Sequence, residues 1–257
     1  LGVQSFITRE LRQTGRRHTA EVVAADVAAL RAGGIEDINL DLIAGLPYQT
    51  RESWEESLDW IERLAAPHVS VYMLEVDEDS RLGLEILGQG QRFGAGDRPS
   101  EELTADLYER AVERLGAMGI AQYEISNFAR RGHESRHNLK YWRLEEYAGF
   151  GADAHSLLGG VRRQNVETAQ EYVERWRRGE GARADEAPAD ACAERFFVGL
   201  RLNEGVTPKA EEWARYAEPI ARFMDAGLLE RKGESLRLTA RGVLLSNEVF
   251  QEFLPAS

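Results

Sequence analysis

The sequence contains a single cysteine, Cys192, among its 257 residues. One thiol cannot form an internal disulfide, and it cannot supply the set of cysteine ligands that a zinc site or an iron–sulfur cluster needs. Because the surrounding residues, ADACAERFFVGL, are half apolar and helical in character, we expect Cys192 to be a small core residue. The chain by itself therefore excludes a disulfide scaffold and a cysteine-ligated metal centre.

Excess basic charge and long apolar runs are also missing. The formal net charge is −12 and the isoelectric point is near 5.1, which disfavours nucleic acids and anionic membranes as partners. No stretch approaches the roughly 20 apolar residues of a transmembrane helix. We therefore expect a cytoplasmic protein with no membrane span and no nucleic-acid partner. The sequence leaves open whether the protein forms a homo-oligomer.

Several common catalytic and phosphate-binding motifs are absent. The sequence has no G-x-S-x-G elbow, no Walker-type loop and no G-x-G-x-x-G loop. Asp153 and His155 by themselves do not indicate the arrangement of side chains that a hydrolytic triad needs. Hydrolysis and P-loop chemistry are therefore disfavoured.

A carboxylate inside a predicted strand is the first candidate functional residue. Residues 35–47, IEDINLDLIAGLP, contain a branched apolar run between glycine-rich turns, which predicts a buried strand. Asp41 lies within this run, where a charge is costly unless it is paired or faces a polar ligand. The pattern alone favours a ligand contact and a structural pairing equally.

Alternating strand and helix patterns predict a parallel sheet for the N-terminal part. The expected strands cover residues 1–6, 35–43 and 69–76, and helices are expected at 20–32 and 52–64. Ligands of such sheets lie beyond the carboxyl ends of the strands. We therefore expect a ligand site at that edge.

Four polar residues are candidates for this site. Gln4, Asp41 and Glu75 are expected at the strand ends, where an amide or a carboxylate can bind ribose hydroxyls. Arg16 lies in the polar loop LRQTGRRH, well placed to bind a carboxylate or phosphate with its planar fork. A solvated side chain is the commoner state of a loop arginine.

The rest of the chain divides into shorter predicted segments. They are a loop at 77–99, a helix capped by Ser100, one strand at 120–129, an irregular stretch at 132–158, a helix at 167–178 and a polar linker at 179–188. From residue 189 onward, helices precede a short hairpin around Gly233 and a helix from about Ala240, as in a winged-helix module. Its thin basic stripe disfavours a DNA-binding regulator.

The stretch RHNLKYW at residues 136–142 is a second candidate site. His137 can ligate haem iron and Tyr141 can ligate or hydrogen-bond, while the leucine and tryptophan beside them can pack on a flat macrocycle. On spacing alone, a loop in which His and Asn satisfy backbone groups is the commoner arrangement. The same applies to His155 in GADAHSLL.

Five ordered motifs resemble the oxygen-independent coproporphyrinogen III oxidase-like radical SAM family, and its haem-chaperone (HemW-like) branch most of all. They are GVQSF at 2–6, GRRH at 15–18, NLDLIAGLPYQT at 39–50, YEISNFARRGHESRHNLKYW at 123–142 and GFGADAHS at 149–156. The resemblance runs from Leu1 into the C-terminal module.

The resemblance implies an α/β fold: the C-terminal half of a partial (β/α) radical SAM barrel and an α+β winged-helix-like C-terminal domain. The expected domains are the barrel half at 1–99, a flanking α/β segment with the H-N-x-x-Y motif at 100–182, and the winged-helix-like domain at 183–257. The implied cofactors of the full-length protein are S-adenosylmethionine and a [4Fe-4S] cluster.

The resemblance also implies roles for the S-adenosylmethionine candidates. Gln4 and Asp41 match the family positions that meet the ribose hydroxyls, and Arg16 matches the position that meets the methionine carboxylate. These are the contacts that the chemistry of the three side chains had already suggested.

The H-N-x-x-Y pattern has an implied role as well. In this sequence it consists of His137, Asn138 and Tyr141. It is proposed to bind haem in the chaperone branch and is not a feature of the true oxidases. The resemblance therefore favours haem binding over a purely structural loop.

One departure from the family limits what the chain can do alone. The C-x-x-x-C-x-x-C motif that holds the family's cluster is absent, so we expect it upstream in a longer protein and do not expect this chain to be catalytically competent by itself. The favoured function is a chaperone that binds haem and transfers it to haem proteins. The alternative is an oxygen-independent coproporphyrinogen III oxidase, with radical SAM decarboxylation in porphyrin biosynthesis.

Overall fold

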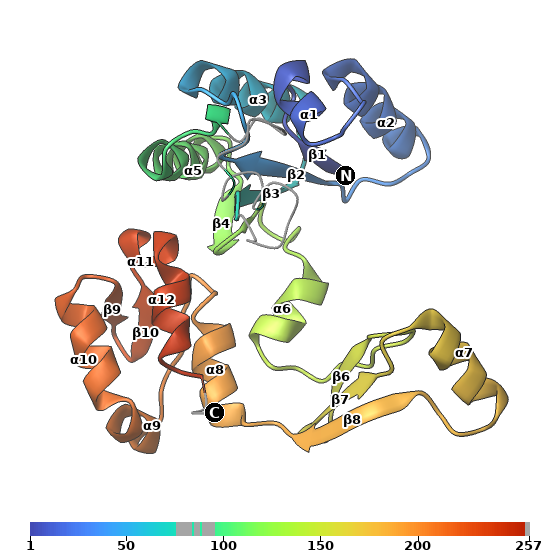
Figure 1. Ribbon diagram of the computed structural model, residues 1–257. Helices are drawn as coiled ribbons and strands as arrows, with labels where there is room; N and C mark the ends of the chain where they lie inside the picture. Colours follow the sequence, from blue (N-terminus) through green and yellow to red (C-terminus); the bar gives the residue numbers. More distant parts are fainter. Residues whose placement is uncertain (76–83, 85–87, 89–95, 255–257) are drawn as a thin grey trace. The chain divides into compact units, whose positions relative to one another are not determined.

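The computed structural model describes residues 1–75, 84, 88 and 96–254. It divides into two compact units, Leu1–Glu134 and Ser135–Ser257 (Figure 1). Most of the predicted loop at 77–99 lies outside the described residues. The three-domain division expected from the sequence stays a prediction.

The first unit is a mixed sheet with helices along the chain between its strands (Figure 1). Its elements are β1 (Gly2–Gln4), α1 (Thr8–Gln13), α2 (Ala20–Ala32), β2 (Asn39–Ala44), α3 (Arg51–Leu64), β3 (His68–Met73), α5 (Glu101–Ala117), β4 (Ala121–Glu124) and β5 (Asn127–Ala129). The strand order is β1-β2-β3-β5-β4. The first three strands are parallel, as predicted, whereas β5 and β4 run antiparallel.

The prediction of one strand at 120–129 was wrong, because the chain reverses between β4 and β5. The carboxylate of Glu124 accepts a hydrogen bond of 3.0 Å from the Ser126 backbone N–H. The backbone oxygen of Ile125 accepts from the Tyr108 hydroxyl and, at 3.0 Å, from Gln122 Nε2. These side chains satisfy the turn's backbone groups, which the apolar pattern did not reveal.

Strand β2 has two different faces. Leu40, Leu42 and Ala44 are fully buried, whereas the alternating residues Asn39 and Asp41 are half-buried on the opposite face. On α3, the side chains of Trp54, Leu58 and Ile61 are fully buried at helical spacing, so they form an apolar stripe. The sequence pattern predicted a strand with both faces buried, but β2 leaves one polar face open.

The strand β2 begins four residues later than predicted. Residues 33–35 instead complete the end of α2, since Ile35 N–H donates to the Leu30 carbonyl oxygen at 3.0 Å and Gly34 has φ +82°. This pattern of a left-handed glycine and a long return hydrogen bond is a common helix ending. Ile35 is consequently exposed.

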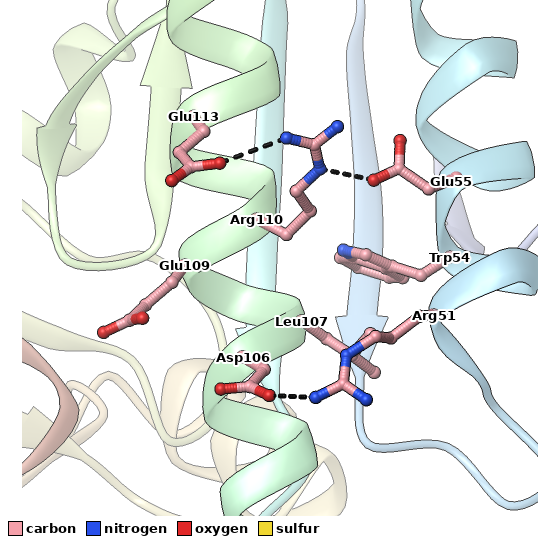
Figure 2. A pocket seen from close by; sticks show the side chains of 8 residues that line it. All are labelled: Arg51, Trp54, Glu55, Asp106, Leu107, Glu109, Arg110 and Glu113. Atoms are coloured by element: carbon pink, nitrogen blue, oxygen red, sulfur yellow. Dashed lines mark hydrogen bonds and ion pairs between the residues drawn. The ribbon is translucent and has the colours of Figure 1, made fainter.

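Helices α3 and α5 pack side by side and leave a pocket of about 320 Å³ between them (Figure 2). The pocket is bordered by the fully buried Trp54 and by two ion pairs, Arg51 with Asp106 and Arg110 with Glu55. None of the predicted site residues lines it.

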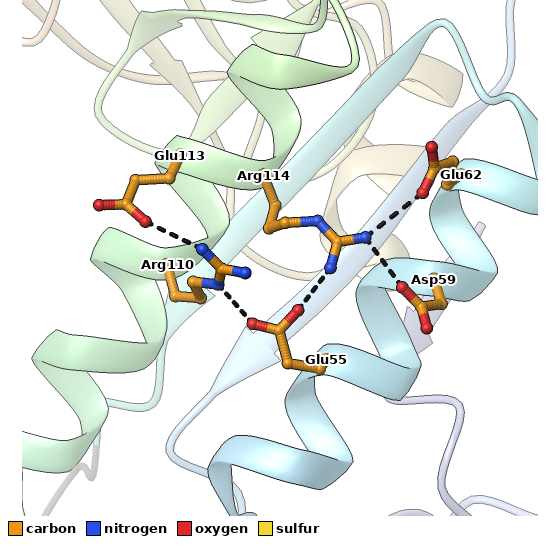
Figure 3. Close-up of polar contacts among 6 residues, drawn as sticks. All are labelled: Glu55, Asp59, Glu62, Arg110, Glu113 and Arg114. Carbon is orange, nitrogen blue, oxygen red and sulfur yellow. Dashed lines mark hydrogen bonds and ion pairs between the residues drawn. The ribbon is translucent and has the colours of Figure 1, made fainter.

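A network of charges joins the same two helices (Figure 3). The carboxylate of Glu55 accepts from both Arg110 and Arg114, and Arg114 also pairs with Asp59 at 2.8 Å and Glu62 at 3.3 Å. These acids raise the pKa of Arg114, chiefly through the hydrogen bond to Asp59. Because the side chains are partly exposed, each pair contributes little on its own.

The second unit contains a three-stranded and a two-stranded antiparallel sheet together with seven helices in its described residues. Its elements are α6 (Arg136–Trp142), β6 (His155–Leu158), β7 (Val161–Asn165), α7 (Ala169–Arg177), β8 (Arg183–Pro188), α8 (Ala191–Gly199), α9 (Ala210–Arg215), α10 (Ala217–Asp225), β9 (Leu229–Lys232), β10 (Ser235–Leu238), α11 (Ala240–Leu244) and α12 (Ser246–Gln251). The helices and the hairpin predicted after residue 189 are confirmed, and two short helices stand where one was expected from about Ala240.

Two predictions for this unit were wrong. The expected linker at 179–188 contains strand β8, whose residues are all exposed and whose extended form comes from pairing with β7, so no burial pattern marked it. The expected irregular stretch contains helix α6, which Ser135 caps by accepting from Asn138 N–H at 3.3 Å.

Cys192 also differs from its prediction. It is half-buried in the first turn of α8, where its N–H donates to the carboxylate of Asp190 at 3.2 Å. The aromatic residues around Phe196, Tyr216 and Phe253 form the core at this point, with the Phe196 and Phe253 rings stacked at 5.0 Å. In the described part of the chain, no helix is long and apolar enough to cross a bilayer.

Candidate functional site

One face of the first unit's sheet carries a row of polar side chains. Strand register pairs Asn39 with His68, Asp41 with Ser70, and Ser70 with Asn127. Because laterally paired residues point to the same face of a sheet, these side chains lie next to one another. They come from three neighbouring strands, β2, β3 and β5.

Asn39 holds the Asp41 carboxylate in place. Its Nδ2 donates to Asp41 Oδ1 at 2.6 Å and to Ser70 Oγ at 3.0 Å, while its Oδ1 lies 2.7 Å from His68 Nδ1. Among the described residues, no hydrogen bond reaches Asp41 Oδ2. One oxygen of Asp41 is thus fixed within the protein and the other is available to a ligand.

The side chain of His68 is neutral at neutral pH. Burial lowers its pKa, and the nearby charge of Asp41 only partly opposes this. A neutral imidazole has one donor, and Asn39 Oδ1 takes it from Nδ1. His68 Nε2 therefore accepts from the Tyr123 hydroxyl at 2.9 Å.

The network continues from Ser70 to a buried acid. Ser70 Oγ donates to Asn127 Oδ1 at 2.7 Å, and Asn127 Nδ2 donates to the carboxylate of Glu124. Glu124 is fully buried and also accepts from Ser126 N–H at 3.0 Å. Such donors compensate a carboxylate that has lost its water.

Gly2 brings the three predicted S-adenosylmethionine residues to one place. It pairs in register with Asp41. A Cβ at Gly2 would lie 3.2 Å from Gln4 Nε2 and 3.4 Å from both terminal nitrogens of Arg16. Arg16 Nη1 also donates to the Gly2 carbonyl oxygen at 3.0 Å. The missing Cβ of Gly2 thus lets the Gln4 amide and the Arg16 guanidinium lie close to the backbone beside Asp41.

The backbone at Gln4 is strained. Its φ is +68°, and the β1–β2 register shifts between Gly2 and Gln4. A non-glycine residue in this region costs on the order of 1–3 kcal/mol and is found most often at binding sites. No hydrogen bond to the Gln4 side-chain amide is present among the described residues. The predicted Glu75 is exposed just beyond β3.

A buried acid joins two loops at the carboxyl ends of β1 and β2. Glu10 accepts from Ser5 Oγ at 2.6 Å and from Gln49 Nε2 at 3.4 Å, while Gln49 Oε1 accepts from Gly45 N–H at 2.6 Å. Burial raises the pKa of Glu10. The loops that follow the two strands are therefore linked by side chains.

The H-N-x-x-Y residues lie on helix α6 in the second unit. The spacing of four residues places His137 and Tyr141 on one helix face, and their rings meet edge to face at 4.9 Å. The Tyr141 ring in turn contacts the Tyr147 ring at 4.5 Å. His137 is exposed, whereas Asn138 and Tyr141 are half-buried.

The residues of this chain do not suit an iron–sulfur cluster. No group of three or more His, Cys, Asp or Glu side chains that could hold a metal ion occurs within residues 1–75, 84, 88 and 96–254. Cys192, the chain's only thiol, lies in the second unit on α8. The Gln4 amide, the Arg16 guanidinium and the Asp41 carboxylate around Gly2 are, by contrast, groups that can bind hydroxyls and a carboxylate.

Comparisons with known proteins identify the family. Residues 187–245 match the family described as HemN C-terminal domain. The chain is 37% identical over 268 residues to "Heme chaperone HemW" from Bacillus subtilis, a match that covers 98% of this chain and 68% of that protein. The same protein from Lactococcus lactis is 34% identical, with 99% and 68% covered. The chain belongs to the HemW family.

The fold is similar to that of a solved relative of this family. Coproporphyrinogen III oxidase (HemN) from Escherichia coli, a radical SAM enzyme, gives a TM-score of 0.78 at 21% identity, covering 98% of this chain and 62% of that chain. The predicted α/β fold class and family resemblance are therefore confirmed. The chain spans about two thirds of the length of these relatives, and the five strands of its first sheet form no closed barrel.

The structure adds site residues that the sequence did not indicate. Asn39, His68 and Glu124 surround the predicted Asp41 or extend its hydrogen bonds, yet none was predicted. The signal was present in the alternation N-x-D of β2 and H-x-S of β3, which places polar residues on one face. The roles of Gln4, Arg16, Asp41 and the H-N-x-x-Y residues stay predictions.

Proposed function

We propose that this HemW-family protein binds haem through helix α6 and delivers it to haem-accepting proteins in the cytoplasm. The observation that carries this proposal is the exposed His137, whose ring is oriented by Tyr141 on the same helix face. An imidazole nitrogen is a common axial ligand of haem iron. An exposed ligand also suits a carrier, because a recipient protein can reach the iron without unfolding a buried site.

The neighbouring motif residues support the histidine. Tyr141 restricts the His137 ring by an edge-to-face contact, and Asn138 lies one residue away, half-buried in the first turn of α6. Fixing the ring reduces the side-chain entropy that binding costs. Asn138 and Tyr141 are thus proposed to position the ligand or to hydrogen-bond to the haem.

We also propose that the first unit contributes part of an S-adenosylmethionine site in the full-length protein. The side chains of Gln4 and Asp41 would bind the ribose hydroxyls, and Arg16 would bind the methionine carboxylate. The close approach of Gln4 and Arg16 to Gly2, beside Asp41, and the free Asp41 Oδ2 support this assignment. Bound S-adenosylmethionine with a [4Fe-4S] cluster supplies the radical chemistry of this superfamily, and the cluster's ligands would have to come from outside this chain.

A haem titration tests the first proposal. The full-length protein should develop a Soret band that saturates with haem, and His137→Ala should weaken binding at least tenfold. His155→Ala is a matched control, because His155 is an exposed histidine in the same unit. Identical spectra for the wild type and His137→Ala would refute His137 as the ligand.

The fold similarity to HemN favours one alternative, an oxygen-independent coproporphyrinogen III oxidase. This alternative predicts that the reconstituted full-length protein, supplied with S-adenosylmethionine and an electron donor, decarboxylates coproporphyrinogen III. The chaperone proposal predicts no decarboxylated product in the same assay, and a clear yield of product would favour the oxidase.

A further inference from the structure

A pocket of about 370 Å³ lies in the second unit next to the H-N-x-x-Y helix. It is formed by residues from α6 and the segment after it, from strands β6 and β7, and from α8. Tyr141 of the motif is itself part of the wall. The volume is in the range of small-molecule sites.

The pocket wall is mainly apolar and aromatic. Tyr147, Leu157, Phe197 and Val198 line it together with Tyr141. Leu157 and Val198 are buried, whereas the Phe197 side chain remains 38% exposed. A large aromatic side chain that borders a pocket and faces water gains free energy when an apolar ligand covers it.

A line of three rings connects the pocket with His137. His137 contacts Tyr141 at 4.9 Å, and Tyr141 contacts Tyr147 at 4.5 Å. Both tyrosines line the pocket, so the histidine lies one ring away from its wall. A single flat ligand of macrocyclic size can therefore contact the pocket and the imidazole together.

One charged group at the pocket is held in a defined orientation. Arg162 donates from Nε and Nη2 to the two oxygens of Glu194, at 2.8 and 2.6 Å, and from Nη1 to the Tyr147 hydroxyl at 3.1 Å. Glu194 thereby raises the pKa of Arg162, mainly through these hydrogen bonds. A guanidinium has five N–H donors, so two remain for a carboxylate.

We propose that this pocket receives part of the ring of a carboxylate-bearing tetrapyrrole whose metal is ligated by His137, with Arg162 binding one carboxylate. This inference rests on the proposed haem-binding function and specifies where the ring lies. The pocket covers only part of the macrocycle. The remainder stays accessible to a recipient protein.

The inference separates ring recognition from metal ligation. Metal-free protoporphyrin IX has the ring and carboxylates of haem but no iron for His137 to ligate. The pocket should therefore bind it, and His137→Ala should reduce the affinity for haem while leaving that for protoporphyrin IX within about twofold.

Pocket-filling variants of the full-length protein provide the test. Val198→Trp should lower the affinity for both haem and protoporphyrin IX at least tenfold, measured by Soret absorbance and by porphyrin fluorescence. Val173→Trp is the matched control, because Val173 is exposed on α7 and does not line the pocket. Phe197→Ser, a change at a partly exposed position, should also lower both affinities. Far-UV circular dichroism confirms that each variant is folded.

The outcomes distinguish this inference from the proposed function. If His137→Ala weakens haem binding but folded Val198→Trp and Phe197→Ser bind both ligands like the wild type, the pocket is not the ring site although the chaperone proposal stands. If the wild type binds no haem but binds protoporphyrin IX in a Val198-dependent manner, the chaperone proposal fails and the pocket is supported. If the wild type does not bind protoporphyrin IX, the pocket inference is overturned, and an apolar side chain of a partner protein becomes its expected occupant.

The role of Arg162 has its own measurement. Wild-type protein should bind protoporphyrin IX at least fivefold more tightly than its dimethyl ester, which lacks ionised carboxylates. Arg162→Gln should abolish this preference, and since the readout is a ratio within one variant, a general loss of affinity does not affect it. If Arg162→Gln still preferred protoporphyrin IX over its dimethyl ester as strongly as the wild type does, Arg162 would be excluded as the carboxylate contact.

Discussion

Asp41 and His137 are both candidate ligand contacts, but their surroundings differ. Asp41 lies on a sheet, where Asn39 fixes one of its oxygens and His68 fixes Asn39 in turn. His137 lies exposed on a seven-residue helix and is oriented by a single ring contact. The first arrangement suits a cofactor that stays bound in a defined geometry, and the second suits a ligand that is passed on.

The difference follows from how the two supports are stabilised. Parallel strands hold neighbouring side chains in register, so a network can form across β2, β3 and β5. A short isolated helix has little stability of its own and depends on its cap and on packing. Variants in the first unit should therefore change S-adenosylmethionine binding and leave haem binding unaltered, and variants on α6 should do the reverse.

The largest effect is expected for Gly2→Val. Its side chain would displace the Gln4 amide and the Arg16 guanidinium, because a single added carbon already meets three of their atoms at 3.2–3.4 Å. We expect the affinity of the full-length protein for S-adenosylmethionine to fall about 100-fold, equivalent to about 2.7 kcal/mol. Isothermal titration calorimetry measures this loss. Retained affinity would show that the surroundings of Gly2 are not part of the site, whereas altered haem binding would break the separation between the two regions.

Asn39→Leu should have a smaller effect on the same ligand. It removes the donors to Asp41 and Ser70 and the acceptor for His68, and leaving such partners unpaired costs on the order of 1–3 kcal/mol. We expect about a tenfold weaker S-adenosylmethionine affinity and a lower thermal midpoint. Val22→Ala is a control in the same unit, since Val22 is an exposed residue of α2. Normal affinity in a folded Asn39→Leu would indicate that Asp41 needs no positioning.

The neutral state of His68 predicts a pH dependence of stability. Because the pKa of His68 is lowered in the folded protein, the unfolded chain binds more protons as pH falls below the usual histidine value of about 6.5. The stability that neutral His68 gives to the folded protein is therefore complete above that pH, and it is lost as the pH falls through the pKa of His68 in the folded protein. The raised pKa of Glu10 acts in the opposite direction, but it is common to the wild type and to His68 variants.

His68→Gln isolates this contribution. The charged and titratable groups that act on His68 are Asp41, Glu134 and His133, and Tyr123 hydrogen-bonds to it. Thermal midpoints measured from pH 7.5 to 5.0 should fall less steeply for His68→Gln than for the wild type. Parallel curves would mean that the pKa of His68 is the same in the folded and the unfolded protein.

The smallest effect is expected for Glu55→Gln, on the helices that pack together beside the sheet. Glu55 accepts from both Arg110 and Arg114, but these side chains are partly exposed and solvent screens them (Figure 3). We expect a fall of about 2 °C in the thermal midpoint and no change in either ligand affinity. The variant thus provides a reference for a purely structural change. Weakened binding of either ligand would show that helix packing affects the sites.

The sequence predicted the parts of the fold in which buried side chains recur at regular intervals. Helices α2 and α3 have buried residues at helical spacing, and strand β2 has alternating buried residues. Their predicted bounds lie close to those observed, apart from the late start of β2. Strand β8 was missed, because all of its side chains are exposed and only its pairing with β7 makes it a strand. Pairing between distant segments leaves no local pattern.

The candidate site was predictable to a similar degree. Asp41 was a candidate because a carboxylate within an apolar run is unusual, and Gln4 and Arg16 were candidates because of their places at a strand end and in a polar loop. The contact between Asn39 and His68 joins residues 29 positions apart, so it depends on strand register. The close approach of Gln4 and Arg16 to Gly2 likewise becomes visible only when these side chains have been placed.

The central claim is that haem is held by the exposed face of α6 and not by the polar face of the sheet. It is tested most directly by titrating haem into full-length wild-type, His137→Ala and Gly2→Val proteins in parallel. The account predicts at least a tenfold loss of haem affinity for His137→Ala and wild-type affinity for Gly2→Val. A loss for Gly2→Val with wild-type affinity for His137→Ala would contradict it.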